Sequence, residues 1–149
     1  RHQLQIAGAP VGKEIPEGTI RQSETGSIIV AVATDAPLLP HQLKRLARRV
    51  PLGLARTGSM SGNGSGDIFV AFSTANAKTW GSSEPAQLKM LPNERMNSLF
   101  EATALATEEA VVNAMIAAET MIGVDGHKII ALPHDRLRDA LKKYNRLAK

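Results

Sequence analysis

A glycine followed by a serine, at the start of an apolar run, is the pair of residues in this sequence best suited to chemistry. Gly26-Ser27 stands directly before the run 28–33. If their peptide bond were cut, the new chain would begin with a serine whose α-amine, with a reference pKa of about 7.7 to 8.0, could act as base for its own hydroxyl. Because glycine has no Cβ, the backbone can adopt the contorted conformation that attack on its carbonyl requires. A serine before a strand is common and carries no signal by composition alone, but this chemistry makes Ser27 a candidate nucleophile.

A glycine-rich loop over residues 58–67 supplies a second group of polar side chains, just before the apolar run 68–73. The loop matches neither the lysine-terminated phosphate loop nor the dinucleotide fingerprint, and a predicted strand rather than a helix follows it. From spacing alone, an ordinary turn is favoured over a functional loop. Its glycines would still leave four polar side chains available at a strand entrance, namely Ser61, Asn63, Ser65 and Asp67.

The remaining chemically active residue types do not form a recognisable site. The four histidines show no i, i+4 pair of the kind that binds zinc on a helix, so we expect neither a metal nor another cofactor. His134 and Asp135 are adjacent, and neighbours on a helix point in different directions, so we interpret them as polar residues at a helix start. The absence of cysteine excludes thiolate nucleophiles and disulfides.

Two unbroken apolar runs must hold these candidates in place. Residues 28–33 and 68–73 have the pattern of strands that are buried on both faces. Between them, Pro37 and Pro40 indicate the start of a helix. Its apolar stripe comprises Leu43, Leu46, Ala47 and Val50, and its basic residues, which we expect to face solvent, are Lys44, Arg45, Arg48 and Arg49.

The other segments complete a mixed α+β pattern. Residues 1–26 are expected to be loop with one short strand, and residues 75–92 a long surface loop. Asn93 is expected to cap a long helix. Its narrow small-residue face, which would let partners approach closely, is formed by Leu99, Ala102, Ala106, Ala110, Ala114 and Ala117. A strand over 128–131 and a helix over 133–147 follow.

Composition bounds the function. The chain has 149 residues with 43% apolar content, which fits one domain. A net charge of +4 with few aromatic residues favours a solvated basic face over nucleic-acid binding. No run approaches the roughly 18 apolar residues that span a bilayer, so no membrane role is expected. Because the sequence starts without methionine, we expect that it was cut from a longer protein whose targeting information is not shown. The location is therefore unknown, and cytoplasmic is favoured because nothing argues for an oxidising compartment.

Three motifs together resemble the L-aminopeptidase D-esterase family, which includes the β-peptidyl aminopeptidases and the DmpA-type enzymes. They are Glu24–Val30, Ala33–Leu38 and Gly62–Asp67. The resemblance covers nearly the whole chain, since it extends to Ile6–Gly12 upstream and to Leu132–Asp135 near the end.

The resemblance implies an αββα layered sandwich like that of N-terminal-nucleophile hydrolases, and a precursor that cleaves itself between Gly26 and Ser27. Residues 1–26 would then be the C-terminal tail of the larger subunit, and residues 27–149 the smaller catalytic subunit. Ser27 would attack the amide or ester of a substrate with a free N-terminal amine. Ser65 would support the nucleophile, and Asp67 would orient Ser65 or stabilise the protonated α-amine.

The same resemblance implies partners. They are the larger subunit of the same precursor and further processed units in a homo-oligomer. The oxyanion-hole asparagine and much of the substrate pocket would lie upstream, so this portion alone is expected to be inactive. Two alternatives stay open: an acyltransferase that passes the acyl group to an amine, and a non-catalytic assembly module that uses the alanine-faced and basic helices.

Overall fold

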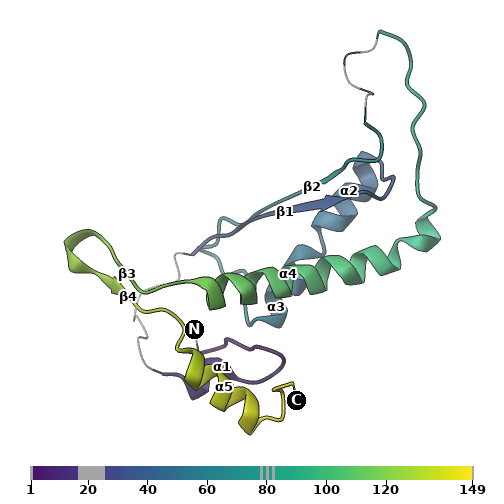
Figure 1. The fold of residues 1–149 in the computed structure, drawn as a ribbon. Helices are drawn as coiled ribbons and strands as arrows, with labels where there is room; N and C mark the ends of the chain where they lie inside the picture. Colours follow the sequence, from purple (N-terminus) through teal and green to yellow (C-terminus); the bar gives the residue numbers. More distant parts are fainter. Residues whose placement is uncertain (1, 17–25, 78, 80, 82, 149) are drawn as a thin grey trace.

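The fold is that of a mixed α+β protein, in which a long helix runs beside a pair of strands (Figure 1). The computed structural model describes residues 2–16, 26–77, 79, 81 and 83–148. In chain order, its elements are α1 (Val11–Glu14), β1 (Ile29–Thr34), α2 (Pro40–Ala47), α3 (Val50–Arg56), β2 (Ile68–Ser73), η1 (Asn93–Arg95), α4 (Asn97–Ala117), β3 (Met121–Ile122), η2 (Val124–Gly126), β4 (Lys128–Ile129) and α5 (His134–Lys143).

The strands β1 and β2 pair in parallel, with a register that runs from Ile29 opposite Ile68 to Thr34 opposite Ser73. Parallel neighbours need a crossover connection of a dozen or more residues. Here α2 and α3 lie in the crossover. Because the pairing is parallel, both strands begin at the same edge of the sheet, and Ser27 and Asp67 each stand just before a strand at that edge.

One face of this sheet is covered by helices. Val32 and Ala71 pack there against a buried cluster of Leu38, Leu46 and Met96. The opposite face is open: Ile29 is 74% exposed and Phe72 is 48% exposed. Burial on both faces, as the apolar runs predict, is therefore wrong for this chain. An unbroken apolar run shows that both faces are apolar, but not which segment covers them, and the described residues cover only one.

The predicted basic helix is divided into two short helices at Arg48 and Arg49. Its apolar stripe is confirmed, since Leu46 and Val50 are buried. The expected solvent-facing basic residues behave in two ways. Lys44 and Arg48 are exposed, whereas the guanidinium carbons of Arg45 and Arg49 lie 5.1 and 3.8 Å from the ring centre of Phe100. Half of this charge therefore packs on an aromatic ring as cation–π contacts.

The long helix α4 differs in two respects from its prediction. Asn93 does not cap it, because Met96 holds that position and Asn93 starts η1. The Asn93 side-chain oxygen instead accepts hydrogen bonds from the Gln42 amide and the Arg45 guanidinium, at 3.2 and 2.9 Å. The alanine face is not the packed face either. The buried residues of α4 are Thr103 and Thr107, while Ala102, Ala106, Ala110, Ala114 and Ala117 are exposed.

Gly53 explains how α3 lies so close to α4. A Cβ at this position would stand 2.4 Å from the Ala104 carbonyl oxygen and 2.6 Å from Thr107 Cβ. Neither atom is the movable end of a long side chain. Any larger residue must therefore push the two helices apart.

We expect Gly53→Ala to lower the free energy of unfolding by about 1 to 3 kcal/mol, the usual cost of overpacking. Urea unfolding, followed by circular dichroism, would measure the loss. Gly123→Ala is the matched control, because its Cβ would meet its nearest neighbour, the His127 carbonyl oxygen, at 3.6 Å. Equal stability of the two variants would show that the α3–α4 contact is not tight.

A second buried cluster joins the two ends of the described chain. Its residues are Ile6, Ala9, Val11, Ile15, Leu137 and Ala140. The short helix α1 was not predicted, because four residues are too few to show helical periodicity. The predicted helix 133–147 is confirmed but is shorter, and the predicted strand 128–131 is reduced to β4. No helix or strand lies in the described part of 75–92, as expected, and none of the described helices is long and apolar enough to cross a bilayer.

Candidate active site

Ser27 lies exposed at the edge where β1 begins, one residue after Gly26. Its Oγ accepts a hydrogen bond of 2.9 Å from the backbone N–H of Gly66. An N–H that points at a hydroxyl oxygen fixes its position and would stabilise negative charge as it develops there. The preceding residues 17–25 lie outside the described residues, so the Glu24-Thr25 part of the motif has no structural test.

Asp67 anchors the same strand entrance. Its Oδ1 accepts a hydrogen bond of 3.0 Å from the backbone N–H of Ile28, the residue after Ser27. Hydrogen bonds from Ser65 above all, then from the Ile28 N–H and from Ser61, lower the pKa of the Asp67 carboxyl below its ordinary value of 3.8. Each bond stabilises the ionised form. At neutral pH the site therefore contains a fixed carboxylate.

The glycine-rich loop turns so that its polar groups meet this edge. Ser65 N–H donates to the Gly62 carbonyl oxygen at 2.9 Å. Ser61 has a positive φ of 46°, an uncommon conformation for a residue with a side chain. The three predicted residues Ser27, Ser65 and Asp67 are thus brought together, although Ser27 lies 38 positions before Ser65 in the sequence. The ordinary turn that spacing favours is present, since Ser65 and Gly62 close it by this hydrogen bond.

Sequence reasoning missed the backbone groups of this cluster. The N–H groups of Gly66 and Ile28 make its two long-range hydrogen bonds. Every residue except proline has such an N–H, so residue type carries no signal for it. The missing side chain of Gly66 also leaves room for the nucleophile, since a Cβ there would lie 3.2 Å from Ser27 Oγ.

His134 contacts another part of the chain. His134 begins α5, and its Nε2 lies 2.9 Å from the Ile116 carbonyl oxygen at the end of α4. It therefore joins two helices and does not form a pair with Asp135, whose carboxylate binds Arg138. Within the described part of the chain, no group of three or more His, Asp or Glu side chains could hold a metal ion.

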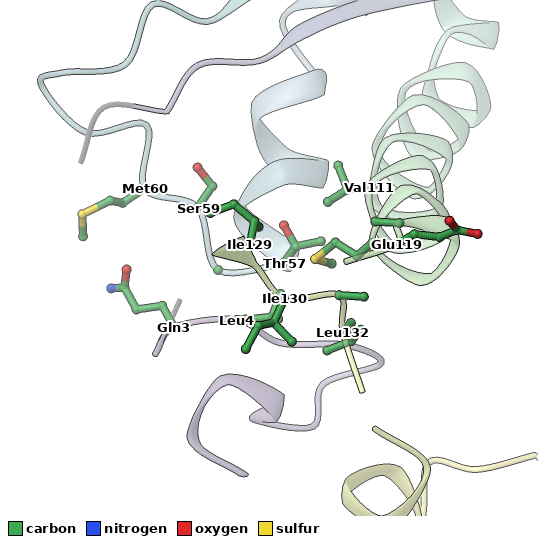
Figure 2. A pocket seen from close by; sticks show the side chains of 14 residues that line it. Gln3, Leu4, Thr57, Ser59, Met60, Val111, Glu119, Ile129, Ile130 and Leu132 are labelled. Carbon is green, nitrogen blue, oxygen red and sulfur yellow. The ribbon is translucent and has the colours of Figure 1, made fainter. Parts of the chain in front are cut away.

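An apolar pocket of about 490 Å³ opens elsewhere, between the N-terminal segment, the loop after α3 and the C-terminal end of α4. Figure 2 shows Leu4, Ile130 and Leu132 at its centre, with Val111 and Glu119 on the α4 side. Neither Ser27 nor Asp67 lines it. The pocket is therefore not assigned to the reaction.

Comparison with known proteins gives this geometry its context. Residues 1–129 match the sequence profile of peptidase family S58. The β-peptidyl aminopeptidase BapA of Sphingosinicella microcystinivorans is 50% identical over an alignment of 164 residues, which covers 99% of this chain and 41% of that protein. The chain thus spans about two fifths of the length of this relative.

Two solved structures have the same arrangement. The L-aminopeptidase D-Ala-esterase/amidase of Ochrobactrum anthropi, described as a prototype of the serine aminopeptidases and a new variant of the Ntn hydrolase fold, superposes with a TM-score of 0.89 at 48% identity, over 99% of this chain and 41% of that one. A β-aminopeptidase from Burkholderia sp. gives 0.81 at 42% identity, over 96% and 41%. The α+β class and the likeness to N-terminal-nucleophile hydrolases are confirmed.

Proposed function

Because the chain belongs to peptidase family S58, a family of aminopeptidases, we propose that it carries the nucleophile of a self-processing serine aminopeptidase. In this proposal, a precursor is cut between Gly26 and Ser27, residues 1–26 end the larger subunit, and residue 27 begins the smaller one. The observation that supports it most is the hydrogen bond from Gly66 N–H to Ser27 Oγ, beside the fixed Asp67 carboxylate.

The cut uses the Ser27 hydroxyl at this edge and one water molecule. Ser27 Oγ attacks the Gly26 carbonyl carbon, the C–N bond to Ser27 breaks, and the proton lost by the hydroxyl passes to the nitrogen, which leaves as the α-amine of Ser27. The resulting ester between Gly26 and Ser27 Oγ is hydrolysed by water. The products are a carboxylate at Gly26 and a free α-amine at Ser27.

The mature enzyme then repeats this chemistry on a substrate. The α-amine of Ser27 takes the hydroxyl proton while Oγ attacks the carbonyl of an amide or ester that bears a free N-terminal amine. The proton passes to the leaving amine or alcohol, and water hydrolyses the acyl-serine. Asp67 holds Ile28, and so fixes the atoms next to the α-amine, while Ser65 supports the carboxylate.

Acyl-enzyme trapping tests the function. The full-length protein is mixed with an amino acid ester and quenched in acid, and the mass of each polypeptide is measured. We expect the polypeptide that begins at Ser27 to gain one aminoacyl group, because serine esters survive acid. An acyl group on the other polypeptide would contradict a Ser27 nucleophile.

Gly26 provides a test of the processing step. A Cβ at this position would meet no described atom within 4 Å, so packing does not explain the glycine. We expect Gly26→Ala to fold normally but to be cut at least about tenfold more slowly, because strained backbone conformations cost a residue with a Cβ about 1 to 3 kcal/mol. A time course of cleavage on denaturing gels would measure the rate, and an unchanged rate would show that no strained conformation is needed.

A further inference from the structure

We propose that residues 2–16 form a latch on α5 which keeps the larger subunit attached to the smaller one after the cut. This inference rests on the proposed cleavage between Gly26 and Ser27. The latch lies before that bond in the sequence, whereas α5 lies after it, and Figure 1 shows α1 and α5 side by side. The two elements must therefore belong to different polypeptides once the bond is broken.

A shared apolar core joins the latch to α5. Four of its six buried residues come from the latch, and two, Leu137 and Ala140, come from α5. The latch residues Ala9 and Val11 have no exposed surface, and Ile15 is 1% exposed. Burial against α5 would be lost if the latch left, and Leu137 and Ala140 would be uncovered. Because cleavage between Gly26 and Ser27 removes none of these contacts, we expect the latch to stay bound to α5.

The latch also has hydrogen bonds of its own. Ile6 and Ala9 exchange two backbone hydrogen bonds of 3.1 and 2.9 Å. The two residues between them have positive φ angles, 51° at Ala7 and 75° at Gly8, as in the tight turns that join paired strands. The Gly12 N–H then closes the unit on the Leu4 carbonyl oxygen at 2.9 Å.

Backbone contacts fix the latch to a second part of the downstream chain. The Gln5 N–H donates to the Thr57 carbonyl oxygen at 3.2 Å, just after α3. Beside it, Gly58 packs so closely on the latch that a Cβ would stand 2.0 Å from the Gln3 carbonyl oxygen. The latch is thus held both by α5 and by the end of α3.

Charges at the rim complete the contact. Lys143 Nζ lies 2.9 to 3.0 Å from the two Glu14 carboxylate oxygens, and Tyr144 Oη donates to Glu14 at 2.8 Å. Arg136 donates to the Glu14 carbonyl oxygen at 3.1 Å. These groups are partly exposed to water, where ion pairs contribute little, so the apolar core must supply most of the attachment.

Hydrogen exchange measured by mass spectrometry on the full-length protein tests the latch. We expect the amides of residues 4–16 to exchange equally slowly in the cut wild-type protein and in the uncut Ser27→Ala variant. In cut Leu137→Ala, we expect their exchange to be at least tenfold faster. In uncut Leu137→Ala the increase should be smaller, because the covalent link keeps the latch at a high effective concentration.

Further variants separate the outcomes. Arg138→Ala, on the exposed side of α5, is the matched control and should leave exchange unchanged. Leu141→Ala, at the edge of the same core, is a milder second variant if Leu137→Ala does not fold. Slow exchange of α4 amides shows in each case that the fold is intact. Exchange of residues 4–16 at the rate of an unfolded peptide in the cut protein would overturn the latch but not the cleavage. A wild-type protein that stays uncut would contradict the proposed function, and the latch would then be ruled out as a contact between subunits.

Discussion

Replacing Ser27 by alanine is expected to leave a single uncut polypeptide with no measurable aminopeptidase activity. The variant has neither the hydroxyl that attacks Gly26 nor the nucleophile of the mature site. Loss of a serine nucleophile lowers kcat by a factor on the order of 10⁶. Ser27 is exposed, so its truncation should not unfold the protein. Denaturing gels measure the cut, and release of an amine from an aminoacyl amide measures the activity.

Two further variants make the Ser27 prediction specific. Ser27→Cys keeps a nucleophilic atom on the same backbone, so slow cutting should persist. Ser98→Ala removes an exposed hydroxyl of α4, which donates to the Arg95 carbonyl oxygen, and should be cut and active like the wild type. If Ser27→Ala were still cut at its usual position, self-processing by this serine would be rejected.

Asp67→Ala should have the second largest effect. The substitution leaves the Ile28 N–H and the Ser65 and Ser61 hydroxyls without their shared acceptor. Because Ile28 follows the nucleophile directly, Ser27 would shift, and a misplacement of about 1 Å costs on the order of 10² in rate. The rate of self-cleavage and kcat/KM for an aminoacyl amide should both fall by about this factor.

Asp67→Asn separates geometry from charge. The amide oxygen can still accept from Ile28, although neutral hydrogen bonds are about half as strong as charge-assisted ones. A loss of about tenfold is therefore expected. Asp35→Ala, which removes an exposed carboxylate at the opposite end of β1, is the control. If Asp67→Ala retained wild-type rates, the carboxylate would have no positioning role.

The pH dependence of stability and of kcat/KM distinguishes the Asp67 carboxyl from the α-amine of Ser27. Because its hydrogen bonds lower the pKa of Asp67, the stability this carboxylate contributes is present above its unfolded pKa and is lost only as pH falls through the lower folded value. We then expect the α-amine of Ser27 to give an acidic limb of kcat/KM between about pH 6 and 8. This limb should persist in Asp67→Asn.

Sequence reasoning was most successful where local pattern decides structure. The apolar runs after Ser27 and Asp67 are strands, and the stripe through Leu46 and Val50 is buried. It was wrong where a distant partner decides. Asn93 binds Gln42 and Arg45 instead of capping α4, and Thr103 and Thr107 pack where alanines were expected. Gln42 and Arg45 lie too far from Asn93 in the chain for their contacts to appear as a periodic pattern in the sequence.

The candidate site shows the same division. The Gly26-Ser27 pair suggested a nucleophile by itself, but the roles of Ser65 and Asp67 came only from resemblance to a family, and membership of that family is confirmed. Their proximity follows from the parallel register of β1 and β2, which is a long-range property. The Gly66 N–H that contacts Ser27 Oγ could not be predicted, since a backbone donor has no residue signature.

The N-terminal residue of the smaller polypeptide tests the central claim most directly. The full-length protein is purified, its polypeptides are separated under denaturing conditions, and each is identified by intact mass and N-terminal sequencing. The proposed mechanism predicts a polypeptide that begins at Ser27 with a free α-amine, and a partner that ends at Gly26. A single uncut polypeptide, or a smaller one that begins at any other residue, would contradict it.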